Sequence, residues 1–152
     1  MTTSEGGGPH IQVAAFCEKA ITEEGTGVLS LIGFVEKITQ TAVGAGVPDE
    51  MPAFSLNSLT LAICLWADQA RGRYSVKIRP ENPSGQQMAS MTMPIQLEGG
   101  PRGVNLITQM NFPIEHEGTY WFDILFSPGS GENDRLLSRV PLEVIYRPQP
   151  TG

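Results

Sequence analysis

Apolar and polar residues alternate with a period of two along most of the chain. Because successive side chains of a strand point to opposite faces, one set of each alternating pair is expected to face a core. The clearest inward set is Leu59, Leu61, Ile63 and Leu65, which alternates with Thr60, Ala62, Cys64 and Trp66. The pattern predicts eight strands: Ile11–Cys17, Val28–Gln40, Leu56–Trp66, Arg73–Arg79, Gln87–Leu97, Val104–Ile114, Thr119–Ser127 and Arg135–Arg147.

Glycine and proline separate these strands. Dense turn signals occur at Pro80–Gly85, Gly99–Gly103 and Pro128–Asp134. Pro94 lies inside a predicted strand, which indicates an edge position or a bulge. Residues 13–24 also fit helical spacing, so a short helix is the alternative there to a strand followed by a loop.

Eight short strands with turns between them predict an all-β domain, an antiparallel two-sheet immunoglobulin-like β-sandwich of about seven to eight strands. A local pattern supports this, because Gly118 lies two residues before Tyr120 and Phe122 lies two residues after it. In such sandwiches a tyrosine at this place reaches back to the preceding loop and fixes the corner. We expect Tyr120 and Gly118 to form such a structural corner.

Composition changes this picture little. The 152 residues include 17 Gly and 12 Pro, and only 17% are charged, which disfavours a helical bundle. We expect one domain over residues 11–148, a flexible N-terminal tail over residues 1–10 and a C-terminal tail over residues 149–152.

Charge excludes some classes of partner. A net charge of −6 disfavours nucleic acids and anionic membrane surfaces. The first ten residues have neither a basic start nor an apolar stretch, so no secretory signal is expected. We therefore expect a cytoplasmic protein in which Cys17 and Cys64 are reduced thiols packed on strands, with a disulfide or a reactive thiol as the alternative.

Several segments resemble a family of bacterial proteins of about this length that is known as a domain of unknown function. The resemblance spans Ile11–Pro148, and the segments that carry it are Val13–Ala20, Gly25–Gly33, Leu59–Trp66, Arg73–Arg79, Glu117–Ile124 and Arg139–Val144. It implies an immunoglobulin-like sandwich without an established activity. No catalytic or ligand residues are carried over from it.

Residues for chemistry are sparse. Of two histidines, His10 lies in the predicted tail, and His116 stands between Glu115 and Glu117. Neighbours on an extended chain point to opposite faces, so a metal would need further ligands from other loops, such as Asp49, Glu50 or Asp134. We expect no metal, no cofactor and no catalytic residue. An enzyme with a loop-built site around His116 is the weaker alternative.

Two surface features are candidates for binding. Arg71, Arg73, Lys77 and Arg79 form a cationic stripe, which either pairs with acidic residues on the next strand or binds an acidic peptide or a phosphate-bearing ligand. Trp66 and Trp121 are placed on outer faces by the alternation, where they could bind a sugar or a protein unless a loop covers them.

The sequence therefore predicts a non-enzymatic interaction module that binds an unknown protein partner or assembles as a homo-oligomer. A partner strand could pair with an open sheet edge, for which Met88–Pro94 is a candidate. The alternative is a sandwich that binds a small ligand or a carbohydrate through its tryptophans.

Overall fold

The computed structural model describes residues 7–128 and 134–150. Their regular elements are the strands β1 (His10–Thr22), β2 (Leu29–Val35), β3 (Lys37–Val43), β4 (Phe54–Glu81), β5 (Met91–Ile114), β6 (Gly118–Ser127) and β7 (Arg135–Gln149). The predicted all-β class is therefore confirmed. Among these residues no helix could cross a membrane. Residues 1–6 and 151–152 of the predicted tails, and residues 129–133 of a predicted turn, lie outside the described residues.

The strands form one continuous sheet in the order β2-β1-β4-β6-β7-β3, with β5 paired to β4. β3 runs parallel to β7, whereas the other pairs are antiparallel. The sheet is therefore mixed, and two separate, purely antiparallel sheets are not what the hydrogen bonds describe. The predicted strand Val28–Gln40 is divided at Glu36. The Glu36 carbonyl accepts a 3.2 Å hydrogen bond from the Glu143 N–H of β7, which directs the chain away from β1.

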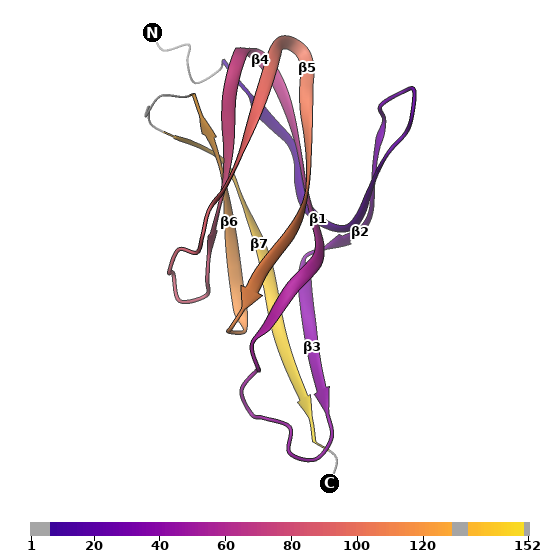
Figure 1. Cartoon of the computed structure of the whole chain (residues 1–152), viewed down its shortest axis with the longest axis vertical. Helices are drawn as coiled ribbons and strands as arrows, with labels where there is room; N and C mark the ends of the chain where they lie inside the picture. Colours follow the sequence, from indigo (N-terminus) through magenta and orange to yellow (C-terminus); the bar gives the residue numbers. More distant parts are fainter. Residues whose placement is uncertain (1–6, 129–133, 151–152) are drawn as a thin grey trace.

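β4 and β5 each join two of the predicted strands. Leu56–Trp66 and Arg73–Arg79 both lie in β4, and Val104–Ile114 lies in β5 with most of Gln87–Leu97. The two long strands pair from Phe54 opposite Ile114 to Ile78 opposite Met91, with register shifts between Trp66 and Arg71. Figure 1 shows both strands curving over together at the top of the molecule. The predicted Gly99–Gly103 loop is this bend.

The bend folds the sheet over onto itself. Phe16 of β1 lies opposite Leu61 of β4, and Phe122 of β6 lies opposite Pro80, nineteen residues further along β4. In a straight strand these positions would be about 60 Å apart. The rings of Phe16 and Phe122 nevertheless meet edge to face with centroids 4.9 Å apart. The two halves of the sheet therefore face each other across one core.

Glycine makes the bend sterically possible. Gly99 and Gly100 have φ values of 81° and 68°, and Asp68 of β4 has a φ of 54° opposite Gly100. Gly103 is extended, but the Leu65 carbonyl oxygen of β4 lies where its side chain would be, 1.8 Å from an added Cβ. The two strands therefore approach each other more closely here than any other residue would permit.

The core contains the side chains that alternation assigned to it. Leu59, Leu61, Ile63 and Leu65 are at most 5% exposed, and they pack with Phe122 and Leu142 from the other half of the sheet. Pro94 lies in β5, which pairs only with β4 among the described strands, so its predicted edge position is confirmed.

The N-terminal strand is longer than predicted. β1 continues to Thr22 as a strand, so the helical alternative for this stretch is wrong. Beyond Cys17 it pairs with β2 in a hairpin that projects from the rest of the sheet (Figure 1). Before β1, the Gly7 carbonyl accepts a 2.9 Å hydrogen bond from the Gln69 N–H, so part of the predicted tail contacts β4.

Candidate functional site

The cationic stripe lies on the outer face of β4, as alternation predicts, with Val76 and Ile78 fully buried on its inner side. Its charges are partly neutralised by acidic neighbours. Lys77 Nζ lies 3.3 Å from an Asp134 oxygen, and Arg79 Nη2 lies 3.3 Å from Asp123 of β6. The expected pairing with an acidic residue of the next strand is therefore found at Arg79, whereas Lys77 pairs with a residue just before β7.

The other two cations of the stripe are exposed. Arg73 lies opposite Gln96 of β5. Arg71 lies at the bend, where its Nε atom would be 3.0 Å from a Cβ added at Gly99. The pairing with β5 is uninterrupted from Arg71 opposite Glu98 to Ile78 opposite Met91, so Arg71 and Arg73 continue the stripe up to the bend.

Trp121 lies next to the stripe but is covered. The Arg139 guanidinium of β7 lies over its ring, 4.8 Å from the centroid. Asp123 and Glu81 each accept a 2.8 Å hydrogen bond from Arg139. The hydrogen bond to Asp123, and then the charges of Asp123 and Glu81, raise the pKa of Arg139 above its ordinary value. Trp121 is therefore a half-buried member of an ion-pair network.

Trp66 lies on the opposite side of the folded sheet from Trp121. It is 38% exposed at the bend, and its ring centroid is 6.2 Å from that of His10. The His10 ring in turn lies 2.9 Å from an Asp68 carboxylate oxygen. The structure thus does not bring Trp66 together with the cationic stripe.

The surface around Trp66 is the largest feature that sequence reasoning missed. We call it the apolar face: the outer side chains of β2, β1, the first half of β4 and the second half of β5. β1 pairs with β4 at Val13–Cys64, Ala15–Ala62 and Cys17–Thr60. β4 pairs with β5 at Ala62–Ile107, and β1 pairs with β2 at Cys17–Phe34. Directly opposed residues share one face of a sheet, so these side chains are neighbours.

Large apolar side chains on this face are open to solvent. Among the described residues, nine large hydrophobic side chains are exposed, and six of them belong to the apolar face: Val13, Ile21, Ile32, Phe34, Trp66 and Ile107. Phe34 is the most open, at 69%. The middle of the face is made of small residues, chiefly Ala15, Cys17, Ala62 and Cys64.

A signal for this face was present in the sequence. In Leu56–Trp66 the outward set of the alternation contains no charged residue, and the same is true of Val13, Ala15 and Cys17 in β1. An antiparallel sheet with one solvated face normally alternates apolar with polar residues. Strands that are apolar on both sides therefore indicated a second covered surface.

Both cysteines lie on the apolar face and both are free. Cys17 is opposite Thr60 whereas Cys64 is opposite Val13, four residues before Cys17 in β1, so the strand spacing keeps the two thiols apart. Burial raises the pKa of each thiol above its ordinary value. Neither is therefore activated as a thiolate nucleophile at neutral pH.

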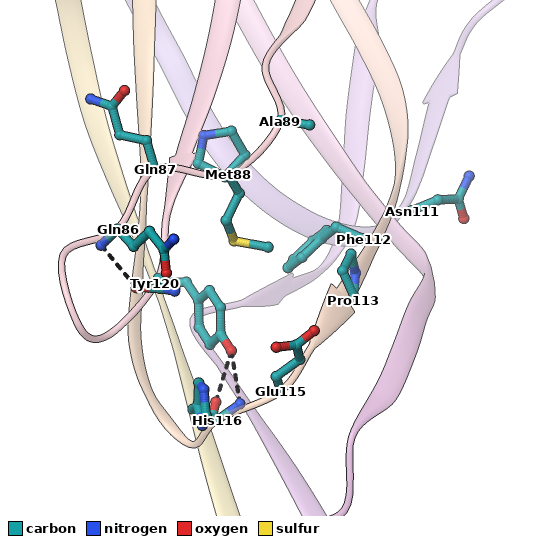
Figure 2. A pocket seen from close by; sticks show the side chains of 12 residues that line it. Gln86, Gln87, Met88, Ala89, Asn111, Phe112, Pro113, Glu115, His116 and Tyr120 are labelled. Carbon is teal, nitrogen blue, oxygen red and sulfur yellow. Dashed lines mark hydrogen bonds between the residues drawn. The ribbon is translucent and has the colours of Figure 1, made fainter.

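A cavity of about 360 Å³ lies at the end of the molecule away from the bend, between the β4–β5 turn and the β5–β6 turn. Figure 2 shows Met88, Phe112 and Tyr120 around it, with Gln86 and Glu115 at its sides. The Tyr120 hydroxyl donates a 2.8 Å hydrogen bond to the His116 carbonyl and accepts one of 3.3 Å from its N–H. Tyr120 thus makes the contact expected of a corner tyrosine.

Gly118 belongs to the same corner. It has a φ of 129°, and a Cβ at this position would lie 2.8 Å from Cβ of Pro83. The close approach to the β4–β5 turn requires glycine at this position. Gly118 therefore lets β6 approach the β4–β5 turn, and Tyr120 fixes the β5–β6 turn beside the cavity.

His116 also borders a second cavity, of about 440 Å³, together with Asp49, Glu50, Glu115 and Glu117. The structure thus brings the suggested loop residues Asp49 and Glu50 close to His116, whereas Asp134 pairs with Lys77 instead. Within the described part of the chain, no three His, Cys, Asp or Glu side chains are arranged to hold a metal ion.

Comparisons with known proteins place the chain in a family. Residues 12–145 match a family of unknown function, DUF6941. No curated protein matches the chain. The family match covers all seven strands in full or in part, including the apolar face and the corner at Tyr120. The chain therefore belongs to the family of unknown function DUF6941.

Proposed function

We propose that this protein is a non-enzymatic interaction module that binds a protein through its apolar face. One observation carries the proposal: six exposed large hydrophobic side chains are gathered on one outer face of the sheet. Soluble monomers rarely expose contiguous apolar patches of more than a few hundred Å², and larger ones mark interaction sites. Covering this face would remove Phe34 and Ile107 from water and is favourable by about 25 cal/mol for each Å² buried.

The chemistry of the face supports a protein as its ligand. Lys19 is the one charged side chain among the outward strand positions of the apolar face. A phosphate-bearing or acidic ligand would find a single cation there. A flat apolar surface instead matches the sheet or hairpin of another protein, because sheets pack face to face through apolar side chains.

A small-ligand site is the second candidate, favoured by the cavity in Figure 2. Its apolar wall of Met88 and Phe112, with the Gln86 amide and the Glu115 carboxylate beside it, suits a compact ligand that has an apolar body and a hydrogen-bond donor. Asn82 is less available to a ligand, since its side-chain oxygen already accepts hydrogen bonds from Ser84 and Gln86.

The finer fold class and the location belong to the same proposal. An immunoglobulin-like sandwich is supported by the corner contact of Tyr120 and by the packing of the two halves of the sheet around one core. A bacterial cytoplasmic location is part of this proposal and is compatible with the partly exposed free thiol of Cys64.

Affinity capture with matched variants tests the proposed function. The bait proteins are the wild-type chain, the face variant Phe34→Ser with Ile107→Ser, and the control variant Val43→Ser with Leu136→Ser. The control pair is 64% and 54% exposed but lies on β3 and β7, off the apolar face. We expect proteins captured by the wild type and the control to be lost from the face variant. Equal capture by all three baits would contradict the proposal.

A further inference from the structure

We infer that the protein bound on the apolar face is a second copy of this chain, packed sheet face against sheet face. The inference rests on the proposed function and names its partner. A two-fold assembly brings the same patch of both copies together, so the patch must be complementary to itself in both charge and shape.

Charge satisfies this requirement. The chain carries a net charge of −6, so two copies repel each other in most orientations. The acidic residues Asp123 and Glu81 lie with the cationic stripe on the other half of the sheet. On the apolar face, Lys19 lies on the projecting hairpin, and Asp68, which contacts His10 beside Trp66, borders the face at the bend. Contact through this face therefore keeps most like charges of the two copies apart.

The shape of the face is compatible with contact between the borders of two copies. The strip of small side chains, with Ala15 and Ala62 in its middle, runs along β1 and β4, and Cys17 and Ala62 within it are fully buried. Phe34 on β2 and Ile107 on β5 border the strip and are exposed. These large side chains are therefore the ones that a second copy contacts.

The area of the face fits a weak contact. Beside Val13–Cys17 the three strands β1, β4 and β5, at about 4.8 Å spacing, make it about 14 Å wide over about 16 Å, and beyond Cys17 only β1 and β2 continue, about 10 Å wide over about 13 Å. The two parts add up to about 350 Å² for each copy, or about 700 Å² for two, the size of weak or transient contacts. Self-association is therefore sought up to high micromolar concentrations of the protein.

Light scattering combined with thiol cross-linking tests this inference on the full chain. The mass is measured between about 1 and 200 μM, a range chosen to bracket micromolar association. We expect it to rise from the monomer value of 16.4 kDa to twice that value. Cys64 lies on the face and is partly exposed. A short bismaleimide is therefore expected to link two copies through Cys64, and Cys64→Ser should abolish that link.

The outcomes separate the two proposals. A wild-type chain that stays at 16.4 kDa throughout overturns the second copy. A dimer that is lost on Leu136→Ser but kept in the variant Phe34→Ser with Ile107→Ser also overturns the inference of a second copy on the apolar face. In either case the proposed function still stands if the face variant loses captured proteins, and it fails only if capture is also unchanged.

Discussion

Replacement of Phe34 and Ile107 together by serine is expected to give a folded monomer whose dissociation constant for self-association is raised at least about 100-fold. Each buried large side chain contributes about 1.5–3 kcal/mol when it is fully removed from water. In a two-fold contact, the double substitution removes both side chains from the interface in each of the two copies. A change of about 1.4 kcal/mol alters affinity tenfold, so partial burial of these side chains already accounts for two orders of magnitude.

The same double variant is expected to keep its stability as a monomer. Phe34 is 69% and Ile107 is 41% exposed, so neither side chain contributes much packing within one chain. Surface substitutions of this kind usually change the free energy of unfolding by less than about 0.5 kcal/mol each. Denaturant unfolding at low protein concentration checks this. Val43→Ser with Leu136→Ser is the control, and association unaffected by the face variant, or reduced equally by both, would refute the assignment.

Gly103→Ala is expected to destabilise the chain by more than about 4 kcal/mol, the range reserved for severe structural conflicts. The added Cβ would lie 1.8 Å from the Leu65 carbonyl oxygen and 2.9 Å from its carbon. Both are backbone atoms of the paired strand, so neither can rotate aside. The strands would have to separate at the bend that folds the sheet over its core. Because domains are stable by only about 5–15 kcal/mol, much of the protein should be unfolded.

Asn105→Ala is the matched control for Gly103→Ala. Asn105 is exposed on the same strand two residues later, opposite Cys64. Chemical unfolding followed by tryptophan fluorescence compares the two variants with the wild type. An unfolding free energy of Gly103→Ala within about 1 kcal/mol of the wild type would show that the bend tolerates a side chain, contrary to the packing described above.

The alternation of apolar and polar residues predicted the core well but not the course of the chain. Leu61 and Ile63 are buried as expected, because the period of two fixes which side chains share a face. The parallel pairing of β3 with β7 depends on residues a hundred positions apart, Lys37 opposite Glu143 for example. No local pattern encodes such a contact.

The joining of predicted strands into β4 and β5 was not predicted for a different reason. Gly72 and the Gly99–Gly103 segment have the composition of turns, so the sequence predicts separate strands on either side of each. In the structure, two bent segments lie beside each other and continue their pairing through the register shifts. A turn signal marks a change of direction, and it does not state whether the hydrogen bonds between neighbouring strands end there.

The candidate site was predictable only in part. The direction of Lys77 and Arg79 followed from alternation, whereas their pairing with Asp134 and Asp123 depends on which segments lie beside β4. Trp66 and Trp121 were both placed outward, but the fold-over puts them on opposite sides. The apolar face was overlooked because small residues such as Ala62 and Cys64 fit either a buried or an exposed position.

The most direct test of the central claim, that the apolar face is covered by protein in solution, is hydroxyl-radical footprinting of the wild-type chain at low and high concentration. Phe34, Trp66 and Ile107 report on the face, and the exposed Val43 and Leu136 are internal controls in the same molecule. We expect oxidation of the first three to fall at high concentration while that of the controls is unchanged. Oxidation of all five that is independent of concentration, or protection confined to Val43 and Leu136, would contradict it.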